Sequence, residues 1–140
     1  SLVLPQWWSG MMELYMALIM VVDDSVIIRK QLMTSLTKHE HQVLEAASAA
    51  AAIDLARSPE PIQLIISDVN MPGMNGLEML AEIRSIPDHA KTPILMLTTE
   101  STEHLQREGM EKGANAWIVK PFNEEQLLAG IAHFLGGESP

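Results

Sequence analysis

The chain has 140 residues, of which 47% are hydrophobic, and this length and composition fit one globular domain with a sizeable core. Its formal net charge of −9 disfavours direct binding to the phosphates of DNA or RNA, and the lack of cysteine excludes disulfide bonds and thiolate chemistry. A chain without cysteine fits a reducing compartment, so we expect a cytoplasmic location.

The N-terminal segment needs to be considered as a membrane span, because residues 1–22 carry a single charge, at Glu13. Pro5 and Gly10 interrupt it and leave 11–22 as the continuous part, which is shorter than the roughly 20 residues that a spanning helix needs. No basic segment precedes this run, so a secretory signal is not expected either. The sequence therefore predicts no membrane insertion.

Residues 1–15 are interpreted as an N-terminal extension, and residues 16–140 as the domain itself. If the extension is ordered, we expect it to form a short helix on the domain surface or at a dimer interface.

Continuous apolar runs predict five strands, at residues 18–22, 43–46, 62–67, 94–97 and 117–119. Runs of this kind are typical of strands that are buried on both faces, as in parallel sheets. Helical patterns fill the gaps between them and follow the last strand. Three of the helices have a residue suited to cap their first turn: Ser25, Ser48 and Asn123.

The segment 101–112 predicts the fourth helix, with Gly113 as its C-cap. Its apolar stripe is thin, since it consists mainly of Leu105 and Met110, and Gly109 lies in its interior. A helix that buries so little is expected to be held loosely.

Strands and helices therefore alternate, which predicts an α/β domain with a (βα)5 doubly wound, five-stranded parallel sheet covered by helices on both faces. In such sheets, reactive groups gather at the carboxyl ends of the strands. The polar residues at those ends are Asp23, Asp24, Asp68, Thr98 and Lys120.

Three of these residues are carboxylates, and each close pair would repel by roughly 4 kcal/mol at 4 Å and an effective dielectric constant near 20. A bound cation would relieve the repulsion, and an all-oxygen, partly hydrated site suits Mg²⁺, with Mn²⁺ as a second possibility. Thr98 and Lys120 add a hydroxyl donor and a positive charge for a phosphoryl group. Because aspartate is an established nucleophile in phosphoryl transfer, we expect Asp68 to be the acceptor.

Four motifs stand in order along the chain: VVDDS, SDVNMPGMNG, TTES and IVKPF. Together they resemble the receiver domain of two-component response regulators, of the stand-alone chemotaxis (CheY-like) type, over about residues 16–137. The resemblance implies the flavodoxin-like fold with strand order 2-1-3-4-5.

The resemblance also implies roles for single residues at the phosphorylation site. Asp68 matches the phosphoacceptor. Asp24, Asp68 and the backbone carbonyl of Asn70 match the Mg²⁺ ligands, while Asp23 acts through water. Lys120 matches the lysine that contacts the phosphoryl group.

Further roles follow for residues near that site. Thr98 matches the hydroxyl that moves toward the phosphoryl group, and Trp117 matches the aromatic switch residue whose ring turns inward in response. Thr99 stands at the mouth of the site, and Asn70 and Glu100 flank the route of attacking water. The peptide bond between Lys120 and Pro121 matches one that is often cis.

A receiver is a signalling switch rather than a metabolic enzyme, although it takes phosphoryl groups from phosphohistidine or small phosphodonors and loses them again. The implied donor is a sensor histidine kinase or a histidine phosphotransfer protein. The implied output is a change in protein contacts on the fourth helix, fifth strand and fifth helix of a monomer or phosphorylation-dependent dimer.

Other functions remain open at this point. The chain could be the receiver part of a longer regulator or hybrid kinase. A magnesium-dependent phosphatase of the haloacid-dehalogenase type also uses a strand-end aspartate, but it needs a second aspartate two residues later, where this chain has Asn70, and a cap domain. A degenerate receiver that only binds partners is disfavoured by the intact Asp24, Asp68, Thr98 and Lys120.

Overall fold

The computed structural model describes residues 16–136, which form a five-stranded parallel sheet between two layers of helices. The strands are β1 (Leu18–Val22), β2 (Gln42–Ala46), β3 (Leu64–Ser67), β4 (Ile94–Thr98) and β5 (Ala116–Val119). Their order is β2-β1-β3-β4-β5, which confirms the predicted topology.

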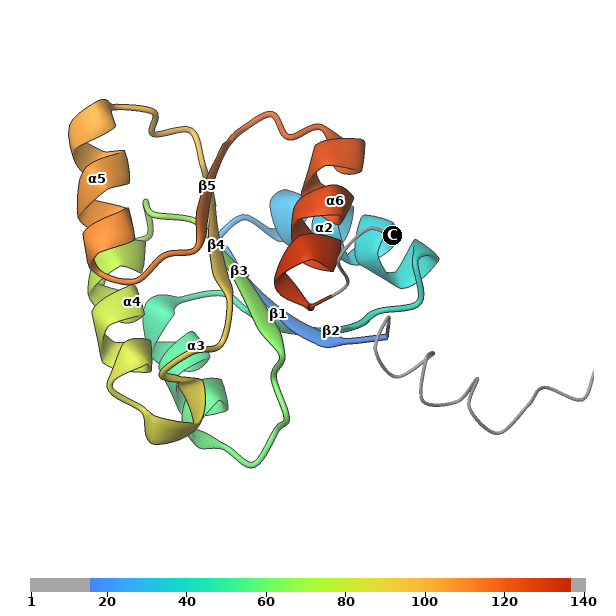
Figure 1. Ribbon diagram of the computed structural model, residues 1–140, viewed down its shortest axis with the longest axis horizontal. Helices are drawn as coiled ribbons and strands as arrows, with labels where there is room; N and C mark the ends of the chain where they lie inside the picture. The colour runs from blue at the N-terminus through green and yellow to red at the C-terminus, as the bar shows by residue number, and fades with distance from the viewer. Residues whose placement is uncertain (1–15, 137–140) are drawn as a thin grey trace, which may run out of the picture.

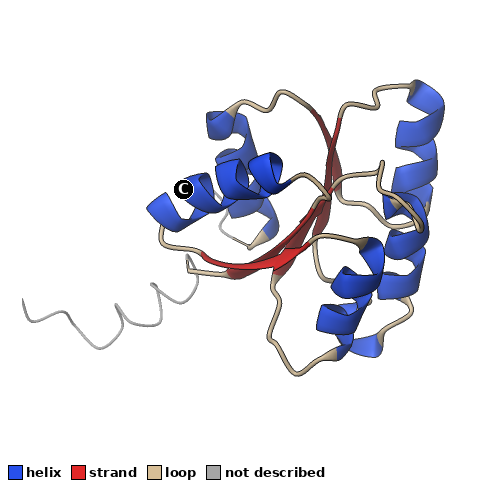
Figure 2. Ribbon diagram, turned by 180° about the vertical axis from the view of Figure 1, so that it is seen from behind, coloured by secondary structure: helices blue, strands red, loops and turns tan. Residues whose placement is uncertain are grey.

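The helices are α2 (Val26–Lys38), α3 (Ala49–Arg57), α4 (Gly76–Arg84), α5 (Glu103–Glu111) and α6 (Glu124–Phe134), with a 3₁₀ turn, η1 (Pro87–His89), before β4. Helices α3, α4 and α5 lie on one face of the sheet, and α2 and α6 lie on the other (Figure 1; Figure 2). This is the doubly wound arrangement that right-handed crossovers produce.

The predicted caps are confirmed. The side chains of Ser25, Ser48 and Asn123 each accept a hydrogen bond from a backbone N–H in the first turn of α2, α3 and α6. Helix α4 adds a reciprocal capping pair, in which Asn75 accepts from the Glu78 N–H and Glu78 accepts from the Asn75 N–H.

Strand β3 begins two residues later than predicted. The N–H of Ile62 donates to the carbonyl of Glu60 within a turn, so the strand pairing with β1 starts at Leu64. Ile62 is still buried, which explains why the apolar run in the sequence begins before the strand does.

Helix α5 differs from its prediction in two ways. It begins at Glu103, because Thr102 rather than Ser101 precedes the first turn and accepts from the Leu105 N–H. Met110 was expected in the buried stripe, but that prediction is wrong, since its side chain is 48% exposed. The buried residue of α5 is Gly109.

The sheet separates two hydrophobic clusters because successive strand residues point to opposite faces. Met20, Ile65 and Met96 belong to the cluster beneath α3 and α4, and Ile19, Ile66 and Leu95 to the cluster that contains Leu32 of α2 and Leu127 of α6. These strand residues are almost fully buried, so the sheet is rigidly packed on both sides.

Arg84, in the last turn of α4, joins three segments of the chain. Its guanidinium group donates to the backbone carbonyls of His89, Thr92 and Gly113 and to the side chain of Asn115, over 2.6–3.1 Å. The planar fork of arginine suits this task, because one side chain can serve several carbonyl acceptors.

Two predictions concern the N-terminal part of the chain. The proposed short helix of residues 1–15 lies outside the described residues. Within 16–136, no helix has the length and apolar character needed to cross a membrane.

Candidate functional site

The pairing of β1 with β3 places two aspartates side by side. Val22 is the register partner of Ser67, and the Asp68 N–H donates to the Val22 carbonyl over 3.0 Å. Asp23 and Asp68 directly follow these two strands, at the carboxyl ends of the sheet. The register of the buried strands therefore fixes the spacing of the site.

Asp23, Asp24 and Asp68 form a compact acidic cluster, in which one carboxylate oxygen of each lies within 4.8 Å of the others. Asp23 is 3% exposed and Asp68 is 9% exposed, whereas Asp24 faces solvent. The donor set consists entirely of oxygen atoms and keeps a solvent-facing side, which fits a small hard cation that retains water ligands.

Lys120 brings a positive charge into this cluster. Its Nζ atom lies 2.8 Å from Asp23 Oδ2 and 3.3 Å from Asp68 Oδ2, and its side chain is 12% exposed. The Lys120 N–H donates to the Thr98 carbonyl over 2.8 Å, and the Lys120–Pro121 peptide bond is cis. The end of β5 is thereby held beside the end of β4, with the ammonium group directed at the acids.

Asp68 is fixed by its own loop. Its Oδ1 atom accepts from the Val69 N–H over 2.7 Å, and its backbone carbonyl accepts from the Ser67 hydroxyl over 2.9 Å. A Cβ atom at Gly76, the first residue of α4, would collide with that same carbonyl. Glycine is thus required for the start of α4 to approach the Asp68 backbone.

Asp23 is held by contacts that the sequence did not reveal. The Ser25 N–H donates to Asp23 Oδ1 over 2.9 Å, and Arg29 Nη1 donates to the Asp23 carbonyl over 2.6 Å. Arg29 also pairs with Glu45 over 3.2 Å. Arg29 lies six positions after Asp23, and its reach back to the strand end depends on the turn between β1 and α2, which no local pattern encodes.

The backbone of Glu100 connects the two residues predicted to act as the switch. The Glu100 N–H donates to Thr98 Oγ1 over 3.2 Å, and the Glu100 carbonyl accepts from Trp117 Nε1 over 2.8 Å. Thr98 is fully buried, and the Trp117 side chain packs against the cluster beneath α3 and α4. Thr98 and Trp117 are therefore linked through a single residue.

The mouth of the site carries a side-chain bridge. Asn70 Nδ2 donates to Glu100 Oε1 over 2.8 Å, which joins the loop after β3 to the loop after β4. Thr99 is exposed beside it. Of the three residues predicted to modulate access, Asn70 and Glu100 therefore contact each other.

A groove of about 960 Å³ opens next to Lys120, between α2 and the segment that joins β5 to α6. Its apolar lining includes Ile27, Ile28, Pro121 and Phe122. Ile27, in the first turn of α2, is 69% exposed.

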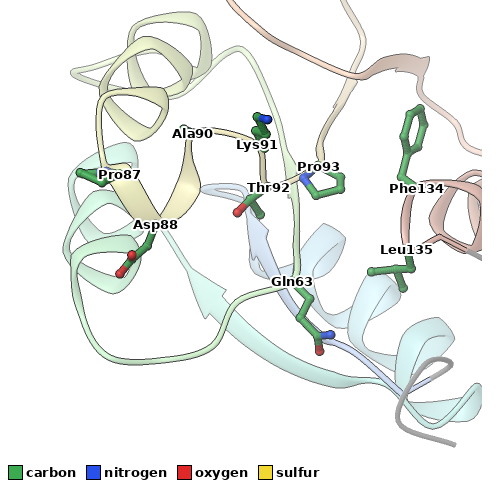
Figure 3. Close-up of a pocket in the computed structure, with 9 residues that line it drawn as sticks. All are labelled: Gln63, Pro87, Asp88, Ala90, Lys91, Thr92, Pro93, Phe134 and Leu135. Carbon is green, nitrogen blue, oxygen red and sulfur yellow. The ribbon is translucent and has the colours of Figure 1, made fainter. Parts of the chain in front are cut away.

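A second pocket, of about 560 Å³, lies at the amino ends of the strands (Figure 3). Gln63 and Pro93, which immediately precede β3 and β4, line it together with Asp88, Lys91 and Phe134 of neighbouring segments. Because it lies at the amino ends of the strands, it is separate from the acidic cluster.

The domain matches a known protein family. A model of the response regulator receiver domain matches residues 19–132, most of the chain. This chain belongs to the response regulator receiver domain family. As a receiver it is a signalling switch rather than a metabolic enzyme, which favours the prediction from the four motifs over the phosphatase alternative.

Individual relatives agree with this assignment. The chain is 37% identical over 119 residues to a chemotaxis protein CheY homolog of Campylobacter jejuni, which covers 84% of this chain and 92% of that protein. It is 40% identical to the chemotaxis response regulator CheY4 of Vibrio cholerae, whose structure matches with a TM-score of 0.80 over 85% of this chain and 98% of that one. The receiver is therefore of the CheY-like type.

A third relative was solved in a complex. The CheX–CheY–BeF3–Mg²⁺ complex of Borrelia burgdorferi contains a chain that is 27% identical to this receiver, with a TM-score of 0.78 over 84% of this chain and 87% of that one.

Proposed function

We propose that Asp68 accepts a phosphoryl group from a phosphohistidine, on a sensor histidine kinase or a histidine phosphotransfer protein. The observation that carries the proposal is the joint contact of Lys120 Nζ with Asp23 and Asp68. It places a nucleophilic carboxylate, a second carboxylate and a cation at one strand edge of a receiver domain.

The transfer step uses the carboxylate of Asp68 as nucleophile. One of its oxygens attacks phosphorus, the P–N bond of the phosphohistidine breaks, and the bond's electron pair stays on the imidazole nitrogen. The product is an acyl phosphate on Asp68 and a histidine in the donor. Lys120 then contacts a phosphoryl oxygen and neutralises its charge, which is the main requirement of phosphoryl transfer.

The oxygen donors of the acidic cluster suit Mg²⁺. We expect the carboxylates of Asp24 and Asp68 and the carbonyl of Asn70 to hold the ion, with Asp23 acting through water. When bound, the ion supplies positive charge that offsets the approach of the phosphoryl group to three acids. The Mg²⁺ and BeF3 in the CheX–CheY complex of the related chain support this choice.

The groove beside Lys120 is the approach route that we assign to the phosphodonor. A donor protein must bring its phosphohistidine to within bonding distance of Asp68, and the exposed side chain of Ile27 and the partly buried side chain of Phe122 border that path. A helical donor surface with apolar side chains around the histidine would bury them.

The switch starts at Thr98, whose hydroxyl can turn toward a phosphoryl oxygen. This movement withdraws the acceptor of the Glu100 N–H, and the Glu100 carbonyl is in turn the acceptor for Trp117. Rearrangement of Trp117 then changes the surface of α5, β5 and α6 and so the affinity for a target protein.

Access to the acyl phosphate is set by the opening around Asp68. We propose that Thr99 narrows it and that Asn70 and Glu100 flank the water that hydrolyses the phosphoryl group. We also propose that residues 16–140 are the receiver unit, preceded by the extension 1–15, and that the protein acts in the cytoplasm.

The test is phosphorylation by acetyl phosphate in the presence of Mg²⁺, followed by mass spectrometry and by Trp117 fluorescence. Replacing Trp7 and Trp8 by Phe leaves Trp117 as the single tryptophan. We expect a phosphorylated species and a Mg²⁺-dependent fluorescence change, both absent in Asp68→Asn. An equal response in Asp68→Asn would contradict the proposal.

A further inference from the structure

Helix α5 contains a glycine in its interior, where glycine destabilises a helix by roughly 1 kcal/mol relative to alanine. Gly109 is nevertheless the buried residue of this helix. A Cβ atom built on it would lie 2.6 Å from Cζ3 and 3.1 Å from Cε3 of the Trp117 ring. The absence of a side chain at Gly109 therefore provides the space that the indole occupies.

The opposite end of the indole is polar and equally constrained. Trp117 Nε1 donates to the Glu100 carbonyl over 2.8 Å, and Glu100 donates to the buried Thr98 hydroxyl. The position of the ring on Gly109 thus decides whether the indole nitrogen can reach the loop that follows β4. The rigid Trp117 side chain therefore packs on α5 at one end and makes a hydrogen bond near the site at the other.

We propose that Gly109 is a positioning residue for the switch, which holds the Trp117 ring in the packed orientation that allows its hydrogen bond to Glu100. The inference rests on the proposed function for its signalling consequence, while the steric pairing can be tested without any phosphodonor. A side chain at this position displaces the ring and releases the Glu100 carbonyl.

The chain provides a matched control. Gly130 lies in the interior of α6, and a Cβ atom there has no heavy atom within 4 Å. Gly109→Ala and Gly130→Ala make the same chemical change in two helices, so both gain the same helix propensity. They differ in whether the new methyl group meets the indole.

The first experiment measures the accessibility of Trp117 to iodide and its emission maximum, in the full chain with Trp7 and Trp8 replaced by Phe and no phosphodonor present. We expect Gly109→Ala to shift the equilibrium away from the packed ring by roughly tenfold. Quenching should rise and the emission move to longer wavelength. Gly130→Ala should match the parent, and equal quenching in all three proteins would overturn the proposal.

The second experiment is a double-mutant cycle on stability, which separates the pairing from general damage to α5. Trp117→Phe removes the outer ring atoms that meet the new methyl group. We expect Gly109→Ala to destabilise the parent and to stabilise the Trp117→Phe protein. The same effect of Gly109→Ala in both backgrounds would contradict a specific contact.

The third experiment connects the pair to signalling. With BeF3⁻ and Mg²⁺, the parent should show a change in Trp117 quenching, and Gly109→Ala should show a much smaller change, because its ring is already displaced. Phosphorylation of Asp68 by acetyl phosphate should still occur in Gly109→Ala. Loss of the response in every protein would count against the proposed function, whereas a full response in Gly109→Ala would count against the role of Gly109.

Discussion

The ammonium group of Lys120 lies 2.8 Å from the carboxylate of Asp23, closer than to Asp68, the proposed nucleophile. Both Lys120 and Asp23 are largely shielded from water, with side chains that are 12% and 4% exposed. The lysine therefore neutralises part of the acidic cluster, and the fold depends on it whenever no other cation is present.

Replacing Lys120 by Met should reveal this dependence. Two buried carboxylates would lose their cation, so we expect the free energy of unfolding in EDTA to fall by about 3 kcal/mol. Addition of Mg²⁺ should restore more stability in this variant than in the parent, since the ion would replace the missing charge. Urea denaturation with and without Mg²⁺ measures both effects.

The control for that variant is Lys112→Met. Lys112 pairs with Glu108 over 3.1 Å, but both side chains are 37% exposed. Its loss should change stability by less than about 0.5 kcal/mol, and Mg²⁺ should have the same effect as in the parent. If Lys120→Met behaved like Lys112→Met, the lysine would not be compensating the cluster.

The bridge between Asn70 and Glu100 predicts a kinetic effect without a stability effect. Asn70→Ala removes a hydrogen bond across the mouth of the site, so acetyl phosphate should phosphorylate Asp68 faster, by roughly threefold for a bond of this kind. Stopped-flow Trp117 fluorescence measures the rate. A rate equal to or below that of the parent would show that the bridge does not limit access.

Arg84 should be one of the most sensitive positions outside the site. Arg84→Met leaves several carbonyls without their donor, and we expect a loss of about 3 kcal/mol of unfolding free energy. Arg84→Lys should recover little, since an ammonium group lacks the planar fork that serves the four acceptors on two segments at once. Arg57→Met is the control, because Arg57 is 59% exposed and pairs with Glu82 over 3.6 Å.

The stability should depend on pH through His41. Its Nδ1 atom accepts from the Ala17 N–H over 3.1 Å, which requires the neutral ring. Burial, and secondarily the charge of His39, hold the pKa of His41 below its ordinary value of about 6.5. Between the two pKa values the unfolded chain binds more protons than the folded one, so stability falls as the pH decreases below about 6.5.

The variant His41→Asn isolates this contribution, because the asparagine oxygen can accept the same hydrogen bond and does not titrate. We expect the difference in unfolding free energy between the parent and His41→Asn to vary between pH 7.5 and pH 5 and to favour the variant at the acidic end. A pH-independent difference for His41→Asn would contradict the assignment.

The sequence predicted the sheet well because its strands are runs of apolar residues, and the ends of those runs carry the acids. Once the strands are parallel and in register, Asp23 and Asp68 have to meet. The roles of these residues in phosphoryl transfer remain predictions. The boundaries were less accurate, as for α5, which was predicted over 101–112 and spans Glu103–Glu111.

The contacts around Trp117 could not be predicted in the same way. The indole packs against α5 where Gly109 has no side chain, and the position of this glycine in a helix interior was the available signal. The hydrogen bonds made by the N–H and the carbonyl of Glu100 depend on the conformation of an irregular loop, and such a conformation has no periodic pattern in the sequence.

The sheet divides the interior into two clusters that have no residue in common. The groove assigned to the phosphodonor lies over the α2 and α6 side, where Ile28 and Phe122 belong to one cluster, and Trp117 belongs to the other. Substitutions that adapt one side to a new donor therefore leave the packing of the other side intact. A receiver built in this way can change the residues that meet its donor without changing the packing of its switch residue, Trp117.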